Sequence, residues 1–335
     1  MQTIGIIGAG YWGKNLIRTF HTLGTASVGY ISDTSPEVLQ GISRQYPGAK
    51  ATLDYRTIFD DPAIHAVVIA TPAVSHYGIA KEALLHGKHV FVEKPMTLTT
   101  EDSLELVTLA EEKNRKLMVG HLLLYHPCIT AIKNSIRAGE LGDIYYLYSQ
   151  RLNLGKVRSD ENALLSFGPH DISVALHLLG AEPVSVNAHG QCYLQDGIED
   201  VVFLTLYFTD RVIANIQLSW LDPHKVRRVT VVGSKKMIFF DDMEPQEKVK
   251  IYDKGVDRSA EYSSYGEFLS LRDGDIYIPG IKMVEPLKLE CAHFIECIER
   301  DLTPLSDGRN GLAVTRVLFA SQKSLGNGGI SVKIE

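Results

Sequence analysis

The sequence has few of the features that mark secreted, metal-binding or membrane proteins. It contains four cysteines among 335 residues, and no two of them form a CxxC pair. This favours buried free thiols in a reducing cytoplasm over disulfides. Twelve histidines are present, but no HxxxH or HExxH pattern occurs among them. We therefore expect no metal site.

Long apolar runs and strong charge of one sign are also missing. No apolar run approaches the roughly 20 residues that a transmembrane helix needs. The opening MQTIGIIGAGYWG shows no basic segment or cleavage site, so we expect a cytoplasmic protein without a signal peptide or membrane attachment. A formal net charge of −6 and a pI near 6.1 argue against a broad surface for nucleic acid, although a local positive pocket remains compatible with them.

What is present is the composition of a globular protein, with 45% hydrophobic and 22% charged residues. At about 100–200 residues per domain, the length favours two domains. We place them at residues 1–122 and 123–335, with a C-terminal helix able to pack back on the first domain. No internal repeat or low-complexity stretch is present.

The first 120 or so residues alternate short apolar runs with longer amphipathic ones. This alternation predicts a doubly wound parallel sheet covered on both faces, a Rossmann-type α/β domain. The expected strands are Thr3–Ile7, Ser27–Ser32, Ala66–Ala70, His89–Val92 and Lys116–Val119. The expected helices are Gly13–Leu23, Ser35–Tyr46, Ser75–His86 and Thr100–Asn114.

Beyond Gly120 the pattern changes to strands joined by short turns. It predicts an α+β domain with a large, mostly antiparallel open sheet. The expected strands are 143–154, 184–194, 199–208, 211–220, 225–232 and 237–240. The expected helices are 124–138, 169–179, 285–300 and 311–325. Residues 253–280 show little periodicity and are predicted to be a long loop.

A glycine-rich turn follows the first expected strand. Gly8, Gly10 and Gly13 form GxGxxG between that strand and a helix, which is the context of a dinucleotide site. The glycines permit a tight turn and close approach of a pyrophosphate. Asp33 ends the second strand and can accept hydrogen bonds from a ribose while repelling a 2′-phosphate. The pattern therefore predicts NAD rather than NADP.

Charged residues follow the strand His89–Val92. Ligands of parallel sheets bind beyond the carboxyl ends of the strands, where Glu93 and Lys94 stand. The stretch ATPAVSH, which contains Thr71, Pro72 and His76, ends a neighbouring strand in the same way. A surface ion-pair corner is the alternative interpretation of Glu93 and Lys94.

Three stretches resemble one family. GIIGAGYWGKN, ATPAVSHYGIAKEALLHGKHVFVEKP and the pair Gly120-His121 are similar to the glucose–fructose oxidoreductase / inositol dehydrogenase (Gfo/Idh/MocA) family. The resemblance covers nearly the whole chain. It implies that Glu93 and Lys94 approach the nicotinamide ribose and the substrate, and that Lys94 stabilises a developing alkoxide. It also implies that His121 approaches the nicotinamide. Tyr11 and Trp12, in the glycine turn, either cover the cofactor or pack.

The resemblance also implies a second catalytic group, His170, in SFGPHDISVALHLLG. Ser166 stands where family members usually carry Asp or Tyr, so the usual partner of this histidine is replaced. Helical spacing places His170 nearly opposite the apolar stripe of its helix, away from the core. A neutral imidazole there suits a general base. For His177, a packing role is the favoured interpretation.

A basic stretch precedes this helix and suggests the substrate. Its side chains would suit a diphosphate, with a solvated charged loop as the alternative. We predict that substrate contacts come from Arg151, Lys156, Arg158, Asn162 and Asp171. Asp171, near the start of the expected helix, is also explained by the helix dipole alone.

The same stretch resembles the branch of the family that oxidises C3 of UDP-sugars. It implies an NAD-dependent UDP-N-acetylglucosamine 3-dehydrogenase, whose product feeds 3-amino sugars of lipopolysaccharide or lipid A. The alternatives are a 3-keto reductase on a dTDP-sugar, a polyol or inositol dehydrogenase, and a non-catalytic NAD-binding regulator. The family usually assembles through its open sheet, which implies a homodimer or homotetramer.

Overall fold

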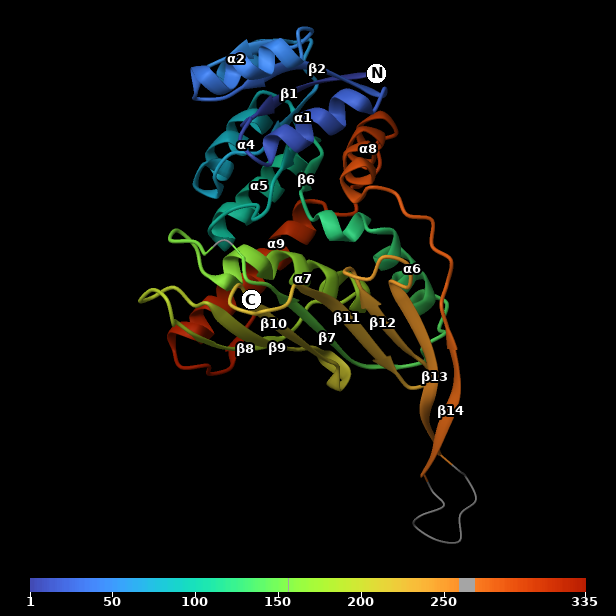
Figure 1. Cartoon of the computed structure of the whole chain (residues 1–335). Coiled ribbons are helices and arrows are strands. Elements are labelled where there is room, and N and C mark those ends of the chain that lie inside the picture. The colour runs from blue at the N-terminus through green and yellow to red at the C-terminus, as the bar shows by residue number, and fades with distance from the viewer. Residues whose placement is uncertain (156, 259–268) are drawn as a thin grey trace. The chain divides into compact units, whose positions relative to one another are not determined.

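The structure of the chain is a computed structural model. It describes residues 1–155, 157–258 and 269–335. The chain divides into two compact units (Figure 1). The first contains Met1–Tyr125 and Val284–Thr315, and the second contains His126–Met283 and Arg316–Glu335. The division at residue 122 therefore differs from the observed one mainly in the segment 284–315.

The first unit is built on a six-stranded parallel sheet in the order β3-β2-β1-β4-β5-β6. This order confirms the predicted Rossmann-type fold. The strands are β1 Gln2–Ile7, β2 Ala26–Ser32, β3 Lys50–Thr52, β4 Ala66–Ile69, β5 His89–Val92 and β6 Leu117–Val119. The sequence analysis missed β3, which is too short to show a periodic pattern.

Helices cover both faces of this sheet. The helices are α1 Gly13–Thr22, α2 Pro36–Gln45, α3 Arg56–Asp60, α4 His76–Leu85, α5 Thr100–Glu112 and α8 Pro286–Glu299. Alternation along β5 divides the core. Val90 and Val92 belong to the buried cluster that includes residues of α4 and α5, whereas the ring of Phe91 meets Phe20 of α1 and Phe294 of α8. The segment 284–315 joins the first unit because α8 buries its apolar side there.

The second unit is built on a nine-stranded sheet in the order β14-β13-β12-β11-β7-β10-β9-β8-β15. Its neighbouring strands pair antiparallel except β7 and β10. This confirms the mostly antiparallel second sheet. The strands are β7 Ile144–Leu152, β8 Ser185–Gln191, β9 Val201–Tyr207, β10 Ile213–Ser219, β11 Val226–Gly233, β12 Met237–Asp241, β13 Val249–Arg258, β14 Leu269–Tyr277 and β15 Val332–Lys333.

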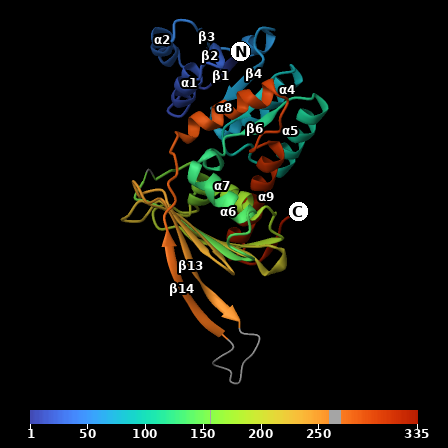
Figure 2. The ribbon, with the colours of Figure 1, turned by 90° about the vertical axis from the view of Figure 1, so that its right-hand side faces the viewer.

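One face of this sheet packs against helices, and the other is open (Figure 2). The helices of the unit are α6 Pro127–Arg137 and α7 Ala163–Leu179, together with the second half of α9 Gly308–Gly326. Along β7, Leu147, Ser149 and Arg151 are buried, whereas Tyr146 and Tyr148 are exposed. The strand therefore directs Arg151 toward the helix-covered face.

Two predictions for this unit were wrong. Part of the expected loop 253–280 forms the hairpin β13–β14, which runs out beyond the rest of the sheet (Figure 1). Cross-strand ion pairs such as Lys254–Asp273 at 2.8 Å accompany its pairing, so its strands lack the apolar alternation of a half-buried strand.

Helix α7 begins at Ala163 rather than Pro169, because Asn162 caps it by accepting a hydrogen bond from the Leu165 N–H at 3.0 Å.

The remaining short elements connect these layers. They are the 3₁₀ turns Ala73–Ser75, Leu122–Tyr125 and Thr209–Arg211. The expected helix 124–138 is thus a 3₁₀ turn followed by α6, because Pro127 occupies the first position of the helix. In the described ranges, no helix has the length and apolar character required to cross a membrane.

Candidate active site

The glycine-rich turn joins β1 to α1 in the first unit. Gly8 has φ of +95°, which favours glycine. A Cβ on Gly13 would lie 2.1 Å from the Gly8 carbonyl oxygen, whereas a Cβ on Gly10 would meet no protein atom within 4 Å. The turn is therefore closed on its protein side and open at Gly10. This geometry fits the approach of a dinucleotide pyrophosphate to the start of α1.

Asp33 stands directly after β2, as the sequence predicts. Its Oδ2 accepts a hydrogen bond from the Ala9 N–H at 2.7 Å, and its Oδ1 accepts one from the Ser35 N–H at 2.9 Å. The carboxylate is thus fixed beside the glycine-rich turn. Of the two aromatic residues of that turn, Tyr11 is 90% exposed, whereas Trp12 reaches back into the protein.

Trp12 bonds to the buried glutamate that follows β5. Its Nε1–H donates to Glu93 Oε1 at 2.5 Å, and the Lys94 N–H donates to Glu93 Oε2 at 3.3 Å. A Cβ on Gly120 would lie only 2.8 Å from Oε2, so glycine leaves room for the carboxyl group. Burial raises the pKa of Glu93 to about 7, against the two hydrogen bonds and the Lys94 charge. Lys94 itself is partly exposed beside this group.

His76 joins the ends of two neighbouring strands. Its Nδ1 lies 2.8 Å from the Pro95 carbonyl oxygen and its Nε2 lies 2.8 Å from the Thr71 carbonyl oxygen. Burial lowers the pKa of His76, and a neutral imidazole donates only one proton, so it bonds to one carbonyl at a time. Because both ring nitrogens face main-chain oxygens, His76 holds the segment after Lys94 in place.

His121 occupies an equally buried position after β6. Its Nδ1 lies 2.7 Å from Asn310 Oδ1, at the start of α9. Burial lowers the pKa of His121 to about 4, with the Lys94 charge lowering it further. The neutral ring therefore donates from Nδ1 to Asn310 and keeps Nε2 as an acceptor. The sequence analysis missed Asn310, which no spacing rule connects to His121.

The second unit carries His170 on α7. The ring is partly exposed, and neighbours on the predicted apolar stripe, Ile172 and Ala175, are fully buried. Ser166, one turn earlier, is buried. His177 lies further along α7, where burial lowers the pKa to about 4. This agrees with a packing role for His177.

The predicted substrate residues are only partly brought together. Arg151 Nε donates to Asp171 Oδ2 in a buried ion pair. Asn162 caps α7 and donates to Glu199 Oε2 at 2.6 Å. Arg158 pairs with Glu161 at 3.0 Å, and Lys156 lies outside the described residues. Asp171 therefore holds Arg151 at α7, one residue after His170, whereas both polar atoms of the Asn162 amide are bonded within the protein.

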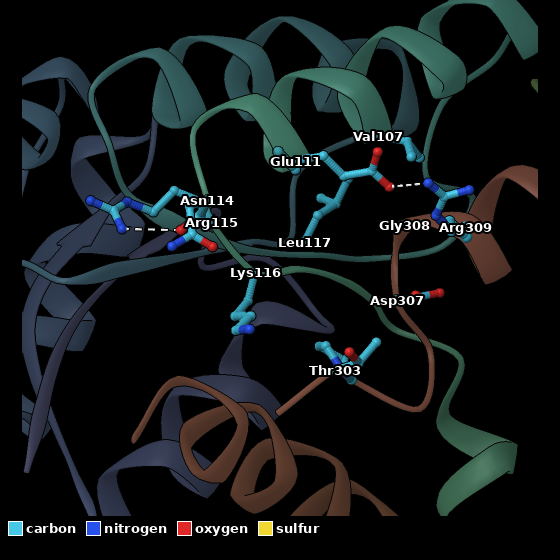
Figure 3. Close-up of a pocket in the computed structure, with 12 residues that line it drawn as sticks. Val107, Glu111, Asn114, Arg115, Lys116, Leu117, Thr303, Asp307, Gly308 and Arg309 are labelled. Carbon is cyan, nitrogen blue, oxygen red and sulfur yellow. Dashed lines mark hydrogen bonds and ion pairs between the residues drawn. The ribbon is translucent and has the colours of Figure 1, made fainter. Parts of the chain in front are cut away.

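A separate pocket of about 320 Å³ lies in the first unit (Figure 3). It is lined where β6 begins, by Lys116 and Leu117, and by the start of α9. Among its charged side chains, Arg309 pairs with Glu111 at 2.6 Å, and Lys116 pairs at 2.6 Å with Asp301, which lies outside the lining. Because it adjoins the beginning of β6, it is distinct from the candidate cofactor site at the carboxyl ends of the strands.

Together, the parallel sheet, the glycine-rich turn and the fixed acid after β2 define an NAD-binding protein of the Rossmann type. The chain belongs to the Gfo/Idh/MocA family. The description "Oxidoreductase family, NAD-binding Rossmann fold" matches residues 2–121, and "GFO/IDH/MocA C-terminal domain" matches residues 129–239. The family resemblance, the enzyme class and the cofactor are thereby confirmed. The chain is therefore an NAD-dependent oxidoreductase whose relatives include dehydrogenases of sugars and polyols.

Relatives span most of the chain. Scyllo-inositol 2-dehydrogenase (NAD(+)) of Bacillus subtilis is 26% identical over 97% of this chain and 93% of its own length. UDP-N-acetylglucosamine 3-dehydrogenase of Acidithiobacillus ferrooxidans is 28% identical over 75% of this chain and 77% of its own. The solved structure of this 3-dehydrogenase superposes with a TM-score of 0.81, at 23% identity and 97% coverage of both chains.

A second solved structure shows the same fold. Levoglucosan dehydrogenase in complex with NADH and L-sorbose superposes with a TM-score of 0.85, at 20% identity, covering 100% of this chain and 99% of that one.

Proposed function

We propose that the protein oxidises the C3 hydroxyl of a UDP-hexosamine, with UDP-N-acetylglucosamine as the best candidate, to the 3-keto sugar. The observation that carries the reaction type is Lys94, which directly follows a buried, hydrogen-bonded Glu93 at the carboxyl end of β5. The substrate class is supported by the 28% identity to a UDP-N-acetylglucosamine 3-dehydrogenase. The product would serve the synthesis of 3-amino sugars, as in lipopolysaccharide or lipid A.

The proposed roles follow from the chemistry of the two side chains. Bound NAD accepts a hydride from the carbon that carries the reacting hydroxyl. His170 takes the hydroxyl proton as general base. Lys94 holds the oxygen and stabilises its developing negative charge. Glu93 and His76 bond to main-chain groups on either side of the Lys94 Cα, so the backbone that carries the lysine is held in place.

The alternatives share the same residues. A 3-keto reductase on a dTDP-sugar would run the reaction backwards, and an inositol dehydrogenase is favoured by the 26% identity to the Bacillus subtilis enzyme. A non-catalytic NAD-binding regulator would bind cofactor without turning over any of these compounds. The least favoured of these is the regulator, since both Lys94 and His170 are present.

The test is NADH formation, followed by ultraviolet absorbance, from NAD and UDP-N-acetylglucosamine with hydroxylamine present to trap the ketone. Lys94→Ala should lower kcat by about 10²- to 10³-fold, and His170→Ala by about 10²- to 10⁴-fold. Lys113→Ala, on an exposed lysine, and His177→Ala, on the same helix as His170, are the matched controls and should retain turnover.

Other outcomes select among the alternatives. Turnover of myo-inositol but not of the UDP-sugar would overturn the substrate assignment in favour of a polyol dehydrogenase. Consumption of NADH or NADPH with a dTDP-keto sugar alone would favour the reductase. Tight NAD binding without turnover of any of these compounds would favour the regulator.

We also propose that the protein forms a homodimer or homotetramer through the open face of the second sheet. Aromatic and aliphatic side chains are exposed there on neighbouring strands, namely Tyr146, Tyr148, Phe203, Tyr207 and Ile213. An apolar patch across adjacent strands is typical of a subunit interface. Light scattering should give a multiple of the 37.1 kDa chain mass, and Tyr148→Lys should reduce it. A monomeric wild-type protein would contradict this.

A further inference from the structure

Two arginines lie directly opposite each other in the second sheet. Strands β11 and β7 pair antiparallel, and their register places Arg227 opposite Arg151. Directly opposed residues project from the same face of a sheet, with Cβ atoms about 4.5–5.5 Å apart, and like charges in this position are destabilising. Both arginines therefore emerge on the helix-covered face, and their charges need a compensating partner.

Carboxylates of the second unit neutralise the charges of these two arginines to different degrees. Asp171 is bonded to Arg151. Arg227 has one ion pair within the described ranges, to Asp242 at 3.9 Å, which is longer than a hydrogen bond. Asp242 also faces Lys248 at 3.3 Å and His126 at 3.4 Å. These groups comprise three permanent cations and two carboxylates, so the cluster has an excess positive charge beside Arg227.

Arg228, the next residue of β11, shows how a structural arginine is arranged in this sheet. It projects to the open face and bonds to Asp241 at 2.6 Å. The exposed fractions of the two side chains are almost equal, 42% for Arg227 and 45% for Arg228. Arg227 thus has the accessibility of its neighbour, but among the described residues its nearest carboxylate is Asp242 at 3.9 Å. Burial and the charge of Arg151 both lower the pKa of Arg227, which an added anion would offset.

The Arg151–Asp171 pair is anchored on α7, the helix that carries the candidate base. Asp171, which anchors Arg151, directly follows His170 on α7. We infer that Arg227, with Arg151 fixed behind it by Asp171, binds an anionic group of the substrate, either a phosphate or a sugar carboxylate. Both groups match the planar fork of a guanidinium. This inference rests on the proposed function in one respect, that the substrate binds beside His170.

The experiment measures equilibrium binding by calorimetry to the full chain saturated with NAD, so that the cofactor site is occupied. The probes are UDP for the phosphate source, glucuronate for the carboxylate source and myo-inositol as a neutral compound. The variants are Arg227→Gln and the matched control Arg228→Gln. Loss of one charge-assisted contact should weaken binding of the anionic probe about 10- to 100-fold. Binding of myo-inositol should change less than threefold, and Arg228→Gln should resemble wild type.

The outcomes separate this inference from the proposed function. Weaker binding of UDP by Arg227→Gln alone supports a phosphate, and weaker binding of glucuronate alone supports a carboxylate. Either result supports the inference even when UDP-N-acetylglucosamine is not oxidised. A failure to oxidise this sugar would refute only the proposed function. Equal affinity of wild type and Arg227→Gln for both anions, or equal losses in Arg227→Gln and Arg228→Gln, would overturn the inference while leaving turnover of the UDP-sugar intact.

Discussion

The two units position their functional side chains by different electrostatic means. In the first unit, burial lowers the pKa values of His76 and His121 and raises that of Glu93. Their hydrogen-bond partners are main-chain groups, the Trp12 indole and the Asn310 amide. In the second unit, oppositely charged side chains bond to each other, as in the buried Arg151–Asp171 ion pair. In the first unit, mainly main-chain groups fix the functional side chains. In the second unit, the pairing of charged side chains fixes them.

We propose that this difference is related to what each unit binds. A site made from backbone turns and neutral buried rings suits a constant ligand, as a shared cofactor is. A site made from ion pairs on a sheet changes when one residue changes, so it can be adapted to different substrates.

Asp171→Asn should have the largest effect on stability. The substitution retains the shape of the side chain but leaves the Arg151 guanidinium buried without a charge partner. Removing one member of a buried ion pair costs about 3–5 kcal/mol. The midpoint of urea unfolding should therefore fall markedly.

The control replaces the pair together. Arg151→Met with Asp171→Leu removes both charges and retains apolar volume, so it should recover most of the lost stability. An Asp171→Asn variant as stable as wild type would show that the second unit does not depend on this pair. Equal losses in the single and double variants would assign the effect to packing instead.

Asp33→Ser tests the cofactor site, and its expected effect is of intermediate size. The serine cannot offer a carboxylate to a ribose hydroxyl, so kcat/KM for NAD should fall about 10- to 100-fold. The ratio of NADP to NAD use should rise, because the negative charge that repels a 2′-phosphate is gone.

Asp54→Ser is the matched control, since Asp54 also follows a strand and its Oδ1 accepts a hydrogen bond from the Arg56 N–H at 3.0 Å. It should leave cofactor preference unchanged. If Asp33→Ser shows an unchanged preference, the acid after β2 is not the determinant of NAD use. Thermal unfolding without cofactor separates this effect from a loss of the bonds to Ala9 and Ser35.

The same difference decides how much could be predicted from sequence. The strand His89–Val92 was predicted with its observed bounds, because parallel strands buried on both faces show as continuous apolar runs. Arg227 could not be identified from the sequence as a candidate anion-binding residue, because that role depends on the strand register that places it opposite Arg151. The hairpin β13–β14 was missed because its pairing is accompanied by cross-strand ion pairs. Asn310 was missed because only the fold brings it to His121.

One residue could have been found in the sequence and was not. Glu290 stands three residues after Leu287 and four before Phe294, on the apolar side of the helix that the sequence predicted. A charged residue at such a position is unusual. The structure leaves Glu290 fully buried, and within the described residues neither carboxyl oxygen has a hydrogen-bond partner. Burial, together with repulsion from Glu93, raises its pKa well above the ordinary value.

Glu290→Gln should have the smallest effect on stability, and this effect should depend on pH. Between the ordinary carboxyl pKa and the raised pKa in the fold, the folded state holds a proton that the unfolded state has lost. The free energy of unfolding therefore falls as pH rises through this window, by at most about 1.4 kcal/mol per pH unit for one proton. Glutamine cannot ionise, so the variant should lose stability less steeply above about pH 5.

The measurement is the urea unfolding midpoint across this pH range, for wild type, Glu290→Gln and Glu296→Gln. Glu296 lies on the same helix but is 46% exposed and pairs with Arg300, so its variant should follow the wild-type curve. Part of the wild-type slope should persist in Glu290→Gln, because Glu93, with a pKa of about 7, titrates in the same direction. Identical slopes for all three proteins would mean that Glu290 ionises without cost, and the first unit would then tolerate buried charge as the second does.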